Sequence, residues 1–378
     1  MSTGPRAVKA LSRAQVRKAR ISGAVMFALA ALIVLVLAPA ADGSASFGLS
    51  MPDDAVQLPA LSVPSSGSLY FLAAVLAFLG GAQFFRGFQG KTTVALGAAF
   101  GLFTIALMVW AAAGEQFSLV SMLVATVSAA TPIALGALSG IMCERSGVVN
   151  IGIEGMLLGG AFTGVLIGSM LGGWAGLVAA TLTGGLLALL LAVLAVNFRV
   201  DQIIIGVVIN ILMLGLTSFL TAQVLVKRPE LNDAPIFESV KIPLLGDIPV
   251  LGPMLFDQPI IVYGMYMAVI YGGMIGGFAG AWFTLGTVGR FDEGMTGGRG
   301  FIGLAAMIFG AWNPIGAFFA ALVFGFFDSL TQKFALLQTP IPGEFLAMAP
   351  YLVTIIVVAG LVGRARPPAA DGQPFEKE

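Results

Sequence analysis

The chain alternates between long apolar runs and short polar segments. Seven of the runs hold enough consecutive apolar residues for a helix to cross the roughly 30 Å hydrocarbon core of a membrane. They are 21–41, 69–85, 93–113, 117–142, 151–171, 174–196 and 201–226. Three more apolar stretches follow, at 259–286, 301–330 and 345–362. The pattern therefore predicts an all-α, polytopic transmembrane helical bundle of about ten spans.

Some of these helices are expected to be broken. Thr131-Pro132 falls inside the fourth run, where the proline lacks a backbone donor and predicts an interruption. Polar and glycine-rich residues predict further breaks near 143–156 and 294–314. Irregular backbone at membrane depth is tolerated only where it is buried in protein or lines a water-filled cavity. Both stretches are therefore candidates for a functional site.

The composition supports a membrane protein. Of the 378 residues, 58% are hydrophobic and only 10% are charged, and 50 are glycine. A soluble fold of this size needs a more highly charged exterior. In lipid that need disappears, and glycine lets helices approach closely where no hydrophobic force drives them together.

Basic residues give the chain a direction across the membrane. Residues 1–20 carry six Lys and Arg side chains and no acidic one. Because basic residues stay on the cytoplasmic side, this segment predicts a cytoplasmic N-terminus; a tail that binds nucleic acid or lipid is the alternative. Arg364 and Arg366 predict a cytoplasmic tail at 364–378. The transmembrane domain is expected to occupy 21–363.

Two polar connections are expected to lie outside the cell. Residues 42–68 are rich in Pro, Ser, Gly and Asp and contain no Lys or Arg. Residues 227–258 combine several prolines with charged side chains, which predicts a substantial second outer loop.

The residue inventory excludes most enzyme chemistry. There is no histidine, and Cys143 is the single cysteine. A His/Cys metal site, a Cys–His or Ser–His–Asp catalytic centre and an intramolecular disulfide are therefore excluded. The Gly90-Lys91-Thr92 string lacks the first glycine and the preceding strand of a phosphate-binding loop, so no nucleotide site is expected.

The first candidate site is the string from Glu144 to Met156. In a helix, Asn150 and Glu154 would share one face, one turn apart. A carboxylate that enters the membrane is costly and normally faces a polar path or a partner. The alternative is a structural role, in which nearby backbone N–H groups satisfy an interfacial Glu154. Glu144 and Arg145 are candidates for contact with a cytoplasmic partner.

The second candidate site is the string from Gly294 to Ile302, with Phe309 to Pro314 after it. It offers Thr296, Arg299 and Asn313 as polar groups on a substrate pathway. The alternative is an ordinary loop with Arg299 reaching to the interface.

Two polar residues stand alone in apolar stretches. Asn210 is a further candidate for the pathway, although a lone polar residue such as Asn210 or Asp328 more often makes a hydrogen bond between helices.

These strings closely resemble the permeases of bacterial ABC importers. The similarity covers roughly 115–362 and rests on Glu144 to Met156, on Gly294 to Phe301 and on Ala305 to Pro314, with 242–253 in the outer loop. The nearest group is the simple-sugar and nucleoside type, which works with lipoproteins of the basic-membrane-protein kind. Branched-chain amino-acid and ribose permeases are more distant.

The resemblance implies the assembly in which the chain works. It implies a bacterial plasma membrane complex with a second permease subunit, an ABC ATPase subunit and an extracytoplasmic substrate-binding lipoprotein. ATP and magnesium would bind to the ATPase, so the permease would need no cofactor and would not be an enzyme. The expected function is import of a nucleoside or a simple sugar, between which the sequence does not choose.

The chain departs from this family at one place. Members have a further span and a cytoplasmic coupling loop between the outer loop and the glycine-rich string. Here Gly264 is followed directly by Met265, and no charged residue occurs from Pro259 to Val288. A few dozen residues are therefore expected to be missing. This leaves open the sidedness of the segments after 259. Two hypotheses follow: the chain is a defective copy, or it couples through another loop, such as 143–147.

Two other classes of function remain as alternatives. A secondary carrier or channel would need a coupling carboxylate in the bundle, for which Glu154 and Asp328 are the candidates. An intramembrane enzyme would need histidine or paired intramembrane carboxylates, which this sequence does not provide.

Overall fold

The computed structural model describes residues 13–263, apart from 53, 55 and 89–91, together with 275–340 and residues 342, 343, 345, 348 and 351. The described chain forms two compact units. The first comprises Met1–Ser50 and Leu58–Leu119, and the second comprises Met51–Gln57 and Val120–Glu378.

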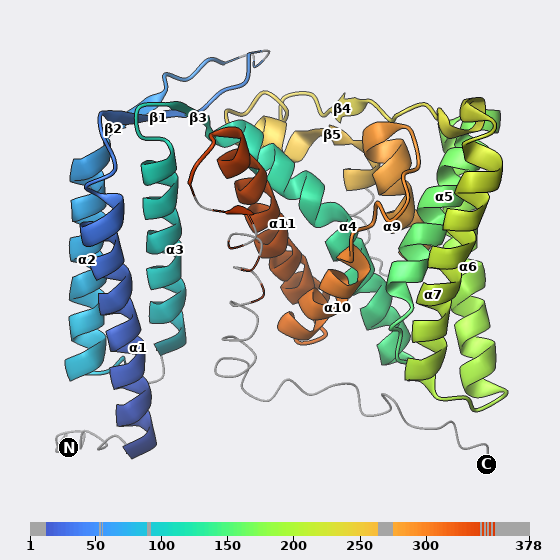
Figure 1. Ribbon diagram of the computed structural model, residues 1–378, viewed down its shortest axis with the longest axis horizontal. Helices are drawn as coiled ribbons and strands as arrows, with labels where there is room; N and C mark the ends of the chain where they lie inside the picture. Colours follow the sequence, from blue (N-terminus) through green and yellow to red (C-terminus); the bar gives the residue numbers. More distant parts are fainter. Residues whose placement is uncertain are drawn as a thin grey trace, which may run out of the picture. The chain divides into compact units, whose positions relative to one another are not determined.

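The first unit contains three long helices and a small sheet (Figure 1). The helices are α1 (Arg13–Leu32), extended by a π-helical turn η1 (Ile33–Leu37), α2 (Ser65–Phe85) and α3 (Thr92–Ala111). The sheet has the order β2-β1-β3, in which β1 (Ser44–Gly48) is antiparallel to β2 (Leu61–Pro64) and parallel to β3 (Gln116–Ser118). Helices α1 and α2 touch through Gly23 and Gly80, where an added Cβ on Gly23 would lie 2.8 Å from the Gly80 carbonyl oxygen.

The second unit is built from seven helices among the described residues. They are α4 (Leu119–Arg145), α5 (Ile153–Leu171), α6 (Gly173–Val196), α7 (Gln202–Leu220) with η2 (Thr221–Leu225), α9 (Gly276–Phe283) with η5 (Thr284–Val288), α10 (Arg299–Phe309) and α11 (Pro314–Leu336). The connection after α7 contains η3 (Pro229–Asn232), β4 (Ser239–Lys241), η4 (Gly252–Phe256) and β5 (Asp257–Pro259), and β4 and β5 form an antiparallel pair.

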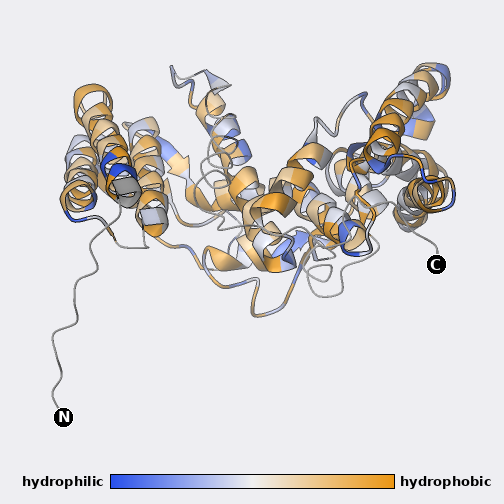
Figure 2. Ribbon diagram, turned by 90° about the horizontal axis from the view of Figure 1, so that it is seen from below, coloured by the Kyte–Doolittle hydropathy of each residue, from blue (hydrophilic) through white to orange (hydrophobic). Residues whose placement is uncertain are grey.

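Eight helices of the described chain are long and apolar enough to cross a membrane, and α10 is a shorter apolar helix. Apolar residues cover the long helices along their length, whereas polar residues gather in the connections (Figure 2). The polytopic helical bundle predicted from the sequence is thereby confirmed. Most of the expected last span at 345–362, the start of the basic segment at 1–12 and the tail at 364–378 lie outside the described residues.

The predicted breaks near 143–156 and 294–314 are confirmed, but two details of the sequence pattern differ. Thr131-Pro132 does not interrupt α4, which is continuous through Pro132. The Thr131 hydroxyl donates to the Val127 carbonyl oxygen at 2.9 Å and so gives an additional hydrogen bond to the turn before the proline. The apolar region 301–330 is not one helix, because Asn313 ends the irregular turn after α10 and caps the start of α11. Short strands also occur in both connections that were expected to lie outside the cell, in addition to the predicted helices.

Glycines bring α9 into direct backbone contact with its neighbours. A Cβ added to Gly277 would lie 1.9 Å from the Ala180 carbonyl oxygen on α6, and one added to Gly160 on α5 would lie 2.5 Å from the Gly277 carbonyl oxygen. On the next turn of α9, a Cβ on Gly280 would lie 2.2 Å from the Leu157 carbonyl oxygen. Any side chain at these positions would separate the helices, so glycine is required for this core.

Contacts between helix ends show which ends share a side of the bundle. Arg145, the last residue of α4, donates to the carbonyl oxygen of Trp312 in the turn between α10 and α11, at 3.0 Å. Near the other end of α11, Lys333 donates to Ser121, close to the start of α4, at 3.1 Å. Helices α4 and α11 are therefore antiparallel, and the α10–α11 turn lies on the side where α4 ends.

We expect Gly277→Leu to destabilise the protein by about 3 kcal/mol or more, because the added side chain overlaps the backbone of α6. Gly185→Leu is the matched control, since Gly185 on α6 is exposed and has no heavy atom within 4 Å of an added Cβ. Heating detergent-solubilised protein and measuring the monodisperse fraction by size exclusion compares the two. Equal midpoints for the two variants would contradict the close packing of α9.

Candidate functional site

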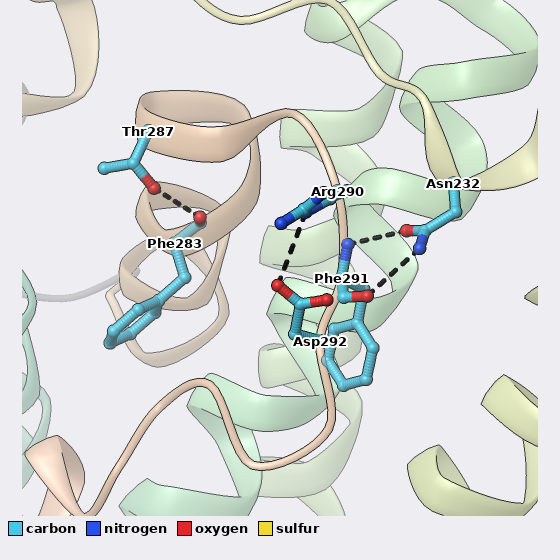
Figure 3. A network of polar contacts seen from close by, with 6 residues as sticks. All are labelled: Asn232, Phe283, Thr287, Arg290, Phe291 and Asp292. Carbon is cyan, nitrogen blue, oxygen red and sulfur yellow. Dashed lines mark hydrogen bonds and ion pairs between the residues drawn. The ribbon is translucent and has the colours of Figure 1, made fainter.

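Residues 289–298 form a non-helical segment that runs along α5. Asn232 of η3 holds the backbone of Phe291 with both ends of its amide (Figure 3). Its Nδ2 donates to the Phe291 carbonyl oxygen at 3.0 Å, and its Oδ1 accepts from the Phe291 N–H at 2.6 Å. The Phe291 ring is buried against Phe162, near the middle of α5. Arg290 and Asp292 pair with each other at 3.5 Å and remain exposed.

The other end of this segment is bound by Glu154, in the first turn of α5. One carboxylate oxygen accepts from the Thr296 hydroxyl at 2.6 Å and from the Gly298 N–H at 2.9 Å. The other oxygen accepts from the Gly300 N–H at 2.6 Å. Since unpaired N–H groups at the start of a helix attract negative charge, the carboxylate also stabilises the N-terminus of α10.

Asn210 of α7 ties the beginning of α5 to the bundle from the opposite side. Its Oδ1 accepts from the Gly155 N–H at 2.7 Å, and its Nδ2 donates to the Ile151 carbonyl oxygen at 2.9 Å. Asn150 is fully buried just before α5, where its Oδ1 accepts from the Gly152 N–H at 3.1 Å. Both amides therefore pair with backbone groups of the break between α4 and α5.

Arg299, the first residue of α10, pairs with Asp328 of α11. The Nη2–Oδ2 distance is 3.0 Å, and the two side chains are 26% and 36% exposed. The guanidinium carbon lies 5.8 Å from the centroid of the buried Phe283 ring of α9, within the range of a cation–π interaction. The pair thus connects three helices of the bundle.

Helix lengths give the distance of three of these groups from the ends of their helices. With a rise of 1.5 Å per residue, Arg299 lies about 15 Å from the far end of α10 and Asp328 about 21 Å from the start of α11. Asn210 lies about 12 Å from the start of α7 on the same basis. With those helix ends at the surface of a hydrocarbon core of roughly 30 Å, the three groups would lie at central depth. We call Glu154, Asn210, Thr296, Arg299 and Asp328 the polar layer.

A second cluster surrounds Trp312 in the turn after α10. Ala311 and Trp312 both have positive φ values, +53° and +56°, which is a strained conformation for residues with a Cβ. The indole Nε1 donates to the buried carboxylate of Glu144, and Arg145 donates to the Trp312 carbonyl oxygen. Asn313 is exposed and caps α11 by accepting from the N–H groups of Ile315 and Gly316. We call residues 311–313 with Glu144 and Arg145 the Trp312 turn.

The structure therefore divides the residues predicted from the sequence into two groups. Glu154, Thr296 and Arg299 meet in the polar layer; Asn210 is also in that layer, and Asn150 lies next to it. Asn313, Glu144 and Arg145 lie in the Trp312 turn instead.

Three further residues were not recognised as site residues from the sequence. Asp328 was expected to make a hydrogen bond between helices, and this is confirmed, because it accepts from Arg299 of α10 within an ion pair; its position as an acidic residue inside an apolar run was a usable signal. Phe283 resembled an ordinary packing residue, whereas Trp312 belonged to the string from Phe309 to Pro314 without being singled out as a polar group. Within the described part of the chain, no group of three or more acidic or cysteine side chains could hold a metal ion.

Comparison with known proteins agrees with this architecture. Residues 122–240 match the family described as branched-chain amino acid transport system / permease component. The chain is 38% identical over 304 residues to the guanosine ABC transporter permease protein NupQ of Bacillus subtilis (strain 168), covering 67% of this chain and 95% of the relative.

Two other relatives have similar coverage. The chain is 33% identical over 301 residues to the nucleoside ABC transporter permease protein NupC of Lactococcus lactis subsp. cremoris, covering 65% of this chain and 94% of the relative. It is 30% identical over 300 residues to the putative glucose ABC transporter permease protein TsgC13 of Haloferax volcanii, covering 64% and 91%. No solved structure matches the chain.

The relatives are longer than this chain over the matched region. The 304 positions aligned with NupQ span 67% of 378 residues, which is about 253 residues of this chain. The relative therefore has about 50 residues there that this chain lacks. The difference agrees in size with the few dozen residues expected to be missing between Gly264 and Met265. That junction lies outside the described residues, so its position stays a prediction.

We expect Glu154→Gln to destabilise the protein by about 1–3 kcal/mol, because the amide nitrogen would face a donor that the carboxylate now accepts from. Glu293→Gln makes the same chemical change at an exposed position of the same segment and should have little effect. The thermal midpoint of each variant in detergent measures the difference. Equal midpoints for Glu154→Gln and Glu293→Gln would show that the Glu154 hydrogen bonds do not hold the segment.

Proposed function

Because the chain belongs to the permease family of ABC transporters, we propose that it forms the membrane path of an ATP-driven importer that carries nucleosides across the bacterial plasma membrane. The substrate class is inferred from two relatives, 38% and 33% identical, whose names specify guanosine and nucleosides. A relative named for glucose is 30% identical, so a simple sugar is the alternative substrate.

The polar layer is the observation that supports a translocation path in this chain. It lies at central membrane depth, where α5 and α10 both begin, and its charged side chains are only partly buried. Transporters commonly form their binding sites near the midplane from interrupted helices of this kind. A charge that faced lipid there would cost several kcal/mol, which favours a water-filled path beside the pair.

The proposed orientation places the N-terminus and the Trp312 turn in the cytoplasm. The six basic residues among the first 20 support it, as does the contact of Arg145 with the α10–α11 turn. The segments at 42–68 and 227–258 would then face outward, where a substrate-binding lipoprotein would dock. In the second of these, the Asp247 carboxylate accepts a hydrogen bond from Lys241. This contact raises the pKa of the Lys241 ammonium and so favours its charged form.

The partner that hydrolyses ATP is proposed to contact the Trp312 turn. This turn connects the proposed cytoplasmic end of α4 to α10, and α10 begins in the polar layer. A displacement of the turn would therefore reach Arg299 through a single short helix. A second permease subunit would complete the complex, in which this chain has no catalytic role.

Cells that express this chain with its ATPase, second permease and lipoprotein should accumulate radiolabelled guanosine. Replacing the phosphate-binding lysine of the ATPase should abolish the accumulation, because the permease has no energy source of its own. Uptake that persists without the ATPase and collapses with an ionophore would instead establish a secondary carrier.

We expect Trp312→Phe to reduce retention of the ATPase during purification about fivefold. Phenylalanine lacks the indole N–H, so the buried Glu144 carboxylate loses a hydrogen bond and the turn loses about 1 kcal/mol or more. Trp174→Phe is the control, since Trp174 is exposed and packs on Phe237 at the other end of the bundle. Equal retention in both variants would contradict a role of the Trp312 turn in docking.

A further inference from the structure

The Arg299–Asp328 pair has unused hydrogen-bonding capacity. Among the described residues, the guanidinium makes one side-chain hydrogen bond, through Nη2, and Asp328 uses one carboxylate oxygen, Oδ2. An arginine has five N–H donors and a carboxylate has two acceptor oxygens. Both side chains also remain about one-quarter to one-third exposed. Toward the part of the chain that the structure describes, the pair therefore presents unused donors next to an unused acceptor.

Aromatic rings accompany the pair. The ring of Phe283 lies under the guanidinium at 5.8 Å. Phe324, one turn before Asp328 on α11, packs edge-on against Tyr351 with the centroids 5.9 Å apart. Tyr351 is 46% exposed, whereas Phe283 and Phe324 are each 4% exposed. The exposed ring of Tyr351 thus packs against α11 one turn away from the Asp328 carboxylate.

This combination matches the chemistry of a nucleobase edge. Guanosine presents the O6 acceptor beside the N1–H donor, and uridine presents O4 beside N3–H. Proteins read such edges with paired donors and acceptors, and they stack the base on aromatic side chains. A pentose or hexose has hydroxyl groups but no carbonyl oxygen beside a ring N–H that this donor and acceptor could read together.

We propose that Arg299 and Asp328 form a recognition site for the Watson–Crick edge of a nucleobase, with Tyr351 beside it. Arg299 donates to the base carbonyl oxygen, and Asp328 accepts from the neighbouring ring N–H through Oδ1. The proposal rests on the nucleoside import proposed above, and it assigns the recognition of that substrate to two named side chains.

The proposal differs from a purely structural role in what it predicts about ligands. An ion pair that only joins α10 to α11 would respond to substitution through stability, without regard to the nucleoside present. A recognition site discriminates guanosine from 1-methylguanosine, in which a methyl group replaces the N1 proton. The test therefore compares these two ligands and adds ribose as a sugar probe.

The experiment uses a cysteine reporter at the site, in membranes that contain the full permease complex. Gln332→Cys, one turn after Asp328 on the same face of α11, is introduced into a chain whose single cysteine, Cys143, is replaced by alanine. Labelling by a small maleimide should occur, because position 332 is exposed. Guanosine should slow the labelling, 1-methylguanosine should require about a tenfold higher concentration, as expected for one lost hydrogen bond, and ribose should not compete.

Two double variants separate recognition from folding. Arg299→Met with Asp328→Leu removes both charges together, which avoids leaving one of them unpaired in the membrane. It should keep the reporter accessible and abolish protection by guanosine. Arg290→Met with Asp292→Leu removes the exposed pair of residues 289–298 and should leave protection unchanged.

Each outcome decides the proposal. Failure of the reporter to label, equal protection by guanosine and 1-methylguanosine, or protection that survives the Arg299/Asp328 double variant would overturn it. Uptake of guanosine by intact cells is measured in parallel. If uptake occurs without selective protection, nucleoside import stands and the assigned site is wrong; if neither occurs, both fail.

Discussion

The second unit depends on how a non-helical backbone is kept inside a membrane. Residues 289–298 have backbone groups that no helix pairs, and each one left unpaired away from water would cost several kcal/mol. At one end, the Asn232 amide makes hydrogen bonds with the N–H and the carbonyl oxygen of Phe291. At the other end, the Glu154 carboxylate accepts from the Thr296 hydroxyl and from the N–H groups of Gly298 and Gly300. A single carboxylate therefore organises the start of α10, and the position of Arg299 follows from it.

The same carboxylate accounts for the direction of the neighbouring helices. Glu154 belongs to the first turn of α5, so its side chain joins the beginnings of α5 and α10. Asn210 fixes the α5 side of this junction through the Gly155 N–H and the Ile151 carbonyl oxygen. Two helix N-termini, with their partial positive charge, are thus held together in the polar layer. Partial charges of this kind suit weak, reversible binding of a neutral, polar solute.

The matched region is about 50 residues shorter than in the guanosine permease. The described helices of the second unit nevertheless pack against one another directly. Gly277 and Gly280 allow α9 to pack on α5 and α6 as a short helix, so a full membrane crossing is not needed to fill this part of the core. The Trp312 turn is held by Glu144 and Arg145, which are local partners on α4. Neither feature requires the missing residues.

Apolar run length determined the helices, because lipid leaves few alternatives to a helix for a long apolar segment. The ends of α5 and α6 were predicted within two residues, and the break before Glu154 was visible from its polar residues. The effect of Pro132 was not predictable, since packing and the Thr131 hydroxyl decided that α4 continues. Nor did the sequence reveal that Glu154 binds residues about 140 positions away, or that Arg299 forms an ion pair with Asp328. Those pairings depend on the backbone-to-backbone approach of α5 and α9 and on the antiparallel return of α11. Local patterns specify which segments enter the membrane; only tertiary packing decides which polar groups meet there.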